Sequence, residues 1–147
     1  MSITTTLQQG VSGYTGCADD RMDATYTTTN YGAHTLGFGG TYSTNRHLRE
    51  LQRWSLASIP ATAVCVSATL QLYHLGTNAG QTSDVIISIY NLLAANAGWV
   101  EGTGLYDGVP ETGAACWAYK AYHAATPTNW AGSAGCGTAD TDYGSTV

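Results

Sequence analysis

The chain has 147 residues and a formal net charge of −5, and 10% of its residues are charged, against about 25% in an ordinary soluble domain. One domain of this length buries roughly 68–70% of its unfolded surface. Five Lys and Arg residues are too few to neutralise phosphates and no apolar run approaches the ~18 residues of a membrane span, so we expect neither a nucleic-acid partner nor membrane insertion.

The first segment, residues 1–12, is expected to be an N-terminal extension. It is rich in Thr and Gln, and Ile3, Thr5 and Leu7 alternate with their neighbours as side chains on one face of a strand do. We expect this extension to act as an arm between subunits, with residues 2–9 pairing with, or packing tightly against, another subunit. Residues 13–147 are expected to form a single domain.

The next segments point to strands. Residues 30–47 are broken by four glycines and support only short strands, whereas Arg49 to Leu56 predicts a strand that ends before Pro60. Its inward face is expected to hold Gln52, Trp54 and Leu56.

Two later segments alternate with a period of two. Val64 to Leu75 and Asp84 to Leu93 each place apolar side chains on one face, and a turn-rich stretch joins them. They predict a hairpin or two strands in facing sheets. A helical turn is expected around Leu92 to Ala97, followed from Gly98 by long ordered loops. The whole pattern predicts an all-β fold, an antiparallel β-sandwich.

Several motifs occur in an order that resembles the DNRLRE-type domains. These are residues 19–23 (DDRMD), 29–32 (TNYG), 49–60 (RELQRWSLASIP), 67–73 (SATLQLY) and 99–104 (WVEGTG). The family consists of extracellular jelly-roll modules related to carbohydrate-binding modules, and it also occurs in phage structural proteins. The resemblance implies a jelly-roll-like sandwich over residues 13–147. Family members continue into further strands, so the resemblance also implies that a neighbouring chain completes the sheet.

The only cluster of carboxylates consists of Asp19, Asp20 and Asp23. On a strand Asp20 points away from the other two, so the three cannot converge on one substrate. They predict either a solvated edge or a structural Ca²⁺ site that loop carbonyls complete. Neither a nucleophile elbow nor a phosphate loop is present, and the histidines lack metal-ligand spacing, so we expect no catalytic residues and no enzyme activity.

The four cysteines favour an oxidising location and are expected to act as staples. Cys116 and Cys136 bracket a loop without a strand pattern, and a disulfide there would contribute about 3 kcal/mol. Cys17 and Cys65 are expected to form an intrachain bond, to link neighbouring subunits or to stay free.

The aromatic residues of the C-terminal third allow two interpretations. Trp117, Tyr119, Tyr122 and Trp130 could stack on a sugar, or they could pack beneath the loop. Trp130 is expected to be the exposed one, and Trp54 and Trp99 are expected to lie in the core.

Two functions follow from these observations. The first is a non-enzymatic structural protein of an extracellular or virion surface, such as a phage decoration or tail-associated subunit, whose partners are its own copies and other structural subunits. It depends on the small size, the low charge and the start of the sequence, which has no secretion signal. The second is a carbohydrate-binding module that takes a polysaccharide partner.

Overall fold

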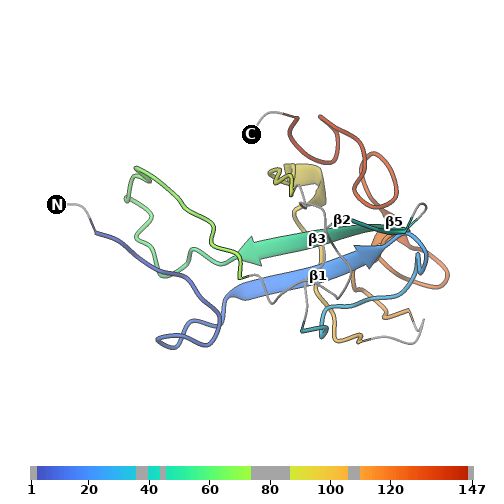
Figure 1. Cartoon of the computed structure of the whole chain (residues 1–147), viewed down its shortest axis with the longest axis horizontal. Helices are drawn as coiled ribbons and strands as arrows, with labels where there is room; N and C mark the ends of the chain where they lie inside the picture. Colours follow the sequence, from blue (N-terminus) through green and yellow to red (C-terminus); the bar gives the residue numbers. More distant parts are fainter. Residues whose placement is uncertain (1–2, 36–39, 44–45, 74–86, 106–109, 146–147) are drawn as a thin grey trace.

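The computed structural model describes residues 3–35, 40–43, 46–73, 87–105 and 110–145. Strands and loops make up these residues, with no α-helix among them, which confirms the all-β class. Antiparallel strands form one sheet in the order β1-β3-β2 (Figure 1), namely β1 (Cys17–Asp23), β2 (Gly40–Ser43) and β3 (Arg46–Trp54). A second, two-stranded sheet pairs β4 (Tyr119–Ala121) with β5 (Thr128–Asn129).

Strand β3 confirms the strand predicted at this position, but the prediction of its inward face was wrong. Leu51 is buried, whereas Gln52 and Leu56 are exposed and Trp54 is only half-buried. The reason lies in the arginines on either side of Leu51. The guanidinium of Arg49 lies 5.3 Å from the ring of Trp117, and that of Arg53 lies 5.0 Å from the ring of Trp99.

These two arginines explain why the alternation of residues along β3 gave the wrong inward face. A guanidinium that stacks on an indole keeps favourable electrostatics while its aliphatic stem packs against apolar surface. Arg49, Leu51 and Arg53 therefore face the loops together, although the pattern of hydropathy places arginine outside.

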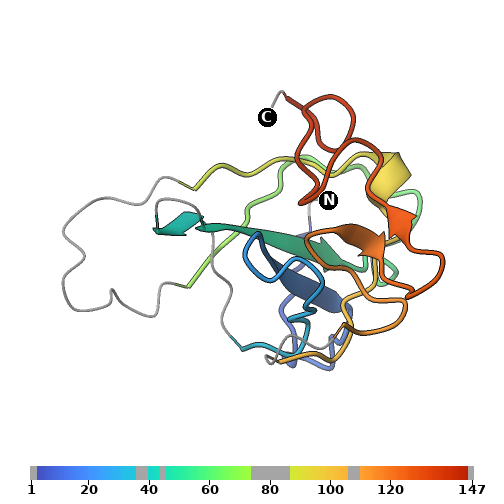
Figure 2. The same ribbon diagram turned by 90° about the vertical axis from the view of Figure 1, so that its right-hand side faces the viewer.

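The core lies between the larger sheet and the loops of the C-terminal third (Figure 2). The sheet and the loops both contribute to its buried cluster, which contains Ala18, Met22, Leu51, Trp99, Ala115, Trp130 and Cys136. As expected, loops dominate this third, and the predicted helical turn is confirmed by a single 3-10 turn, η1 (Ala94–Asn96). The described ranges contain no helix that is long and apolar enough to cross a membrane.

The two segments with the clearest alternation do not form strands in the single chain. Residues 64–73 have no strand and are exposed, and residues 87–91 are likewise exposed. Further along, Leu92 forms only an isolated bridge with Tyr143. The remainder of both predictions, residues 74–75 and 84–86, lies outside the described residues.

Candidate functional site

The three aspartates of β1 do not come together as a calcium site. The Oδ1 atom of Asp23 accepts a hydrogen bond from the backbone N–H of Thr25 (2.9 Å), and Asp19 is half-buried beside Glu101. Asp20 and Asp23 are buried, so a solvated edge is wrong for both. Within the described part of the chain, no group of three or more His, Cys, Asp or Glu residues is placed to hold a metal ion.

The carboxyl group of Asp20 is buried, and its two oxygens differ in their hydrogen bonding. Its side chain is 1% exposed, and its Oδ1 accepts a hydrogen bond from the backbone N–H of Tyr31 (3.1 Å). Its Oδ2 has no hydrogen-bond partner among the described residues. Burial raises the pKa of Asp20 from 3.8 to about 9, since the hydrogen bond from Tyr31 only partly opposes it, and the nearby charge of Glu50 adds to the rise. Asp20 therefore stays protonated at neutral pH.

The aromatic residues of the C-terminal third do not form an exposed platform. Trp130, the residue expected to be exposed, is 4% exposed, and its indole N–H donates to the carbonyls of Cys116 (3.1 Å) and Trp117 (3.2 Å). Trp117 is half-buried under Arg49. The prediction for Trp130 was wrong because the loop folds inward and gives the indole N–H buried partners. Trp99 is buried, as predicted.

Three of the four aromatic candidates, Trp117, Tyr119 and Tyr122, are partly accessible. Tyr119 and Tyr122 are half-buried, with ring centroids 6.1 Å apart and planes inclined at 51°. Tilted rings of this kind do not present the two coplanar faces that a sugar chain would stack against. The structure thus brings the four candidates into one region without making them a flat binding surface.

All four cysteines are free thiols in the structure, so the expected disulfide between Cys116 and Cys136 is not formed. Both of these residues are buried, Cys17 is half-buried and Cys65 is exposed. Burial raises the pKa of Cys136 to about 12, and the negative charge of Asp142 contributes to the rise. Burial also raises the pKa values of Cys116 and Cys17. Buried, protonated thiols react slowly.

The thiols are therefore expected to react with iodoacetamide in a fixed order. Cys65 should be alkylated first and Cys17 more slowly, while Cys116 and Cys136 should be protected until the chain unfolds, because burial blocks access and keeps them protonated. Peptide mass spectrometry after timed labelling would measure this order. The control adds denaturant without reductant, where all four thiols should react. Resistance of Cys116 or Cys136 under those conditions would contradict the free thiols.

The side chain of Asn30 joins two of the motifs that carry the family resemblance. Its Nδ2 donates to the carbonyls of Glu101 (2.5 Å) and Ala115 (2.9 Å), and its Oδ1 accepts from the N–H groups of Gly32 (3.1 Å) and Gly104 (2.9 Å). A Cβ atom at Gly32 would collide with the carbonyl of Glu101. Residues 30–32 and 99–104 therefore hold the loops together, which is a structural role and not a binding one.

Asp142 organises the last loop and was missed by the sequence analysis. Its Oδ1 accepts hydrogen bonds from the Gly132 N–H (2.8 Å) and from Asn96 Nδ2 (2.8 Å), and its Oδ2 accepts from the N–H groups of Ser133 (3.0 Å) and Thr138 (2.8 Å). Burial acts to raise the pKa of Asp142, but these hydrogen bonds together lower it. The available signal was a loop rich in Gly, Ser and Thr that contains two aspartates, Asp140 and Asp142.

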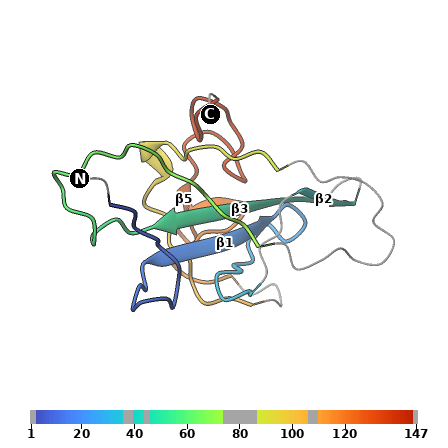
Figure 3. The ribbon, with the colours of Figure 1, turned by 60° about the vertical axis from the view of Figure 1, so that its left-hand side comes forward.

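Two segments leave the same end of the larger sheet and form an uncharged region, here called the neutral lobe (residues 3–16 and 55–73). Cys17 begins β1 and pairs with Trp54, which ends β3, so both segments start side by side and project beyond the sheet (Figures 1 and 3). Neither contains Asp, Glu, Lys, Arg or His. Their exposed large apolar side chains are Ile3, Val11, Leu56, Ile59 in part, Val64, Val66, Leu70, Leu72 and Tyr73.

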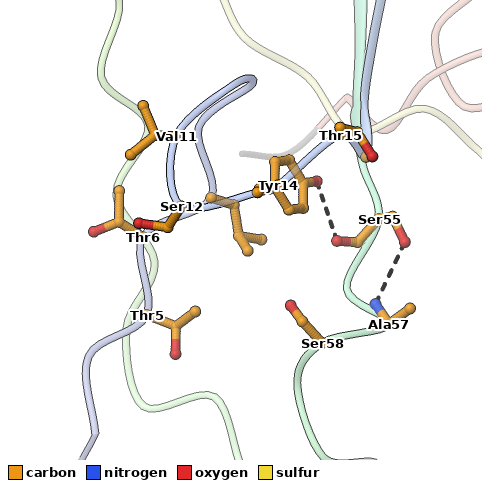
Figure 4. A pocket seen from close by; sticks show the side chains of 12 residues that line it. Thr5, Thr6, Val11, Ser12, Tyr14, Thr15, Ser55, Ala57 and Ser58 are labelled. Carbon is orange, nitrogen blue, oxygen red and sulfur yellow. Dashed lines mark hydrogen bonds between the residues drawn. The ribbon is translucent and has the colours of Figure 1, made fainter.

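A cleft of about 450 Å³ lies within the neutral lobe, between its two segments (Figure 4). The hydroxyl of Tyr14 donates to the carbonyl of Ser55 (3.1 Å), and the N–H of Ser55 donates to the carbonyl of Gly16 (2.8 Å), so the two segments are tied at their base. The lining consists of hydroxyl, methyl and backbone groups from residues 5–7, 11–16, 55, 57 and 58. These groups can make uncharged polar and apolar contacts.

Comparisons with known protein families, with curated protein sequences and with solved structures each gave no match.

Proposed function

We propose that this chain is a non-enzymatic structural protein of an extracellular or virion surface, of the kind that decorates a phage particle or its tail. Its partners are then copies of itself and other structural subunits. The neutral lobe is the observation that supports this proposal. Exposed apolar patches often mark contact surfaces, and the exposed apolar side chains of the neutral lobe lie on segments without charged residues.

The net charge of the chain also favours contact through the neutral lobe. The chain carries a net charge of −5, so two copies repel one another wherever their acidic regions approach. The neutral lobe is free of that repulsion. A contact through it removes apolar surface from water, which is the main driving force of association.

The proposal includes the jelly-roll-like sandwich. In the single chain, residues 64–73 and 87–91 keep the alternation of strands but lack strand partners within the described residues. Pairing with neighbouring chains would convert such segments into strands, because a strand needs a second backbone to complete its hydrogen bonds. The assembled state would then supply the strands that the family resemblance implies.

The N-terminal arm gives a direct test. Residues 3–9 are largely exposed and belong to no strand, and Gln9 Oε1 accepts a hydrogen bond from the N–H of Cys17 (3.2 Å). Deleting residues 2–9 is expected to leave a folded protein that no longer assembles, because the core lies elsewhere. Circular dichroism would check folding, and sedimentation with electron microscopy would check assembly.

Two double substitutions to lysine, one on each face of the arm, provide a matched control. Ile3→Lys with Leu7→Lys should block assembly, whereas Thr4→Lys with Gln8→Lys adds the same charge to the opposite face and should reduce assembly far less. Normal assembly of the deleted protein, or a wild-type chain that stays monomeric at every concentration, would overturn the proposal.

A further inference from the structure

Residues 64–72 of the neutral lobe have a symmetric pattern about Ala68. The even positions are apolar, with Val64 and Val66 on one side of Ala68 and Leu70 and Leu72 on the other. The odd positions are small or neutral polar residues, and they too are matched, since Ser67 mirrors Thr69. All nine residues are exposed, and Val66 is 87% exposed.

This symmetry is what an antiparallel pairing of two identical strands requires. Residues directly opposite one another in such a pair point to the same face. With Ala68 opposite its own copy, Val64 lies opposite Leu72, and Val66 lies opposite Leu70. A shift by one position would place apolar side chains opposite polar ones, and a shift by two would leave a terminal apolar residue unpaired. The register through Ala68 is therefore the best matched.

The segment also lacks the features that usually protect an edge. Proteins discourage edge-to-edge pairing with Lys, Pro or inward-pointing charges. Residues 61–73 contain no Pro and no charged side chain. Among the described residues, no backbone N–H or C=O between positions 64 and 73 makes a backbone hydrogen bond, and the Ser67 carbonyl accepts one from the thiol of Cys65 (3.5 Å). The other backbone groups of the segment can therefore bond to a partner strand.

We infer that residues 64–72 pair antiparallel with the same residues of a second copy, about a two-fold axis at Ala68. Such a contact is isologous, because each residue meets its mirror partner in both directions. The pairing places the five even-numbered apolar side chains of each chain on one face of a two-stranded ribbon. This inference rests on the proposed function, because the pairing is a contact between two copies within the proposed assembly.

Disulfide trapping tests the register at single-residue resolution. In a Cys65→Ser background, Ala68→Cys is expected to form an intermolecular disulfide under mild oxidation, because facing strand residues lie within the Cα separation that a disulfide allows. Ser67→Cys in the same background is the matched control, since Ser67 faces Thr69 of the other copy and not itself. Ser67→Cys combined with Thr69→Cys should restore cross-linking. Non-reducing mass spectrometry of chymotryptic peptides, with fragmentation of each linked pair, would identify each bond, because no Lys or Arg separates these positions from Cys116.

We expect about tenfold more covalent dimer from the Ala68→Cys chain than from the Ser67→Cys chain. Equal cross-linking of the two, or an Ala68→Cys chain whose introduced thiol stays free, would overturn the inference. So would an intrachain pairing of residues 64–72 with residues 87–91, seen as protected amides in a strictly monomeric chain. Circular dichroism confirms that each variant is folded.

The experiment separates this inference from the proposed function. If the wild-type chain assembles while the introduced thiol of the Ala68→Cys chain stays free, the contact at Ala68 is refuted and the proposed function stands. If the Ala68→Cys chain forms a disulfide-linked dimer that adds no further subunits in sedimentation, the pairing is supported and the role in a larger assembly is refuted.

Discussion

Replacing Asp20 with Asn is expected to change how the free energy of unfolding depends on pH. The pKa of Asp20 is about 9 in the folded chain and 3.8 as its ordinary value. Between these values the folded state holds one proton more than the unfolded state, so stability is full below pH 3.8 and falls as pH rises toward 9. The fall amounts to about 1.4 kcal/mol per pH unit.

Asn cannot ionise, and its amide resembles the protonated carboxyl in shape. The Asp20→Asn chain should therefore lose this slope and become more stable than wild type at pH 8, by about 4 kcal/mol more than at pH 5. Urea unfolding at several pH values would measure the difference. The control is Asp140→Asn, because Asp140 is exposed and its pKa is lowered by hydrogen bonds from Ser145, so it stays ionised across this range. Parallel pH curves for wild type and Asp20→Asn would show that Asp20 is not buried as described.

Replacing Asp142 with Ala is expected to destabilise the chain by about 3–5 kcal/mol. The substitution removes the acceptor of four hydrogen bonds, three from backbone N–H groups and one from Asn96. Asn96 is fully buried, so its amide would be left without this partner. Thermal and urea unfolding would measure the loss.

Asp140→Ala in the same loop is the matched control. Asp140 is exposed, and among the described residues its carboxylate accepts hydrogen bonds only from Ser145, so its loss should change stability little. The effect of Asp142 should also depend on pH. Its pKa is lowered in the folded chain, so its contribution is present above the ordinary value of 3.8 and is lost as pH falls through the folded value. An Asp142→Ala chain as stable as wild type at pH 7 would refute this role.

The two aspartates act in opposite directions along the pH scale. Asp20 weakens the fold as pH rises from about 4 toward 9, whereas Asp142 weakens it as pH falls below about 4. Together they predict greatest stability in mildly acidic solution. Burial acts to raise the pKa of both carboxyl groups, but hydrogen-bond donors at both oxygens of Asp142 outweigh it, whereas Asp20 has a donor at only one oxygen among the described residues.

Local properties of the chain were enough to predict the all-β class and several elements. The strand at β3 and the turn at η1 follow from residue preferences and short-range spacing, and the burial of Trp99 follows from its large apolar area. The sequence analysis considered the aspartates of β1 as strand residues, and the structure places them on a strand. Their surroundings were not predicted, because burial depends on which distant loop covers a residue.

Distant contacts decided the rest. Leu51 faces the core because the indoles of Trp99 and Trp117 accept the guanidiniums on either side of it, and Trp130 is buried because two carbonyls receive its N–H. The Asn30 contacts join positions more than 70 residues apart. No spacing along the sequence reveals such partners.

Residues 64–72 show most clearly what local sequence determines and what tertiary structure decides. Their alternation is a local property, and by itself it determined that this segment suits a strand with one apolar and one polar face. Whether the strand forms was decided by tertiary structure, because a strand exists only where a second backbone supplies hydrogen bonds and a second apolar surface excludes water. Within the single chain, that second backbone does not lie beside residues 64–72 among the described residues, and the segment stays exposed.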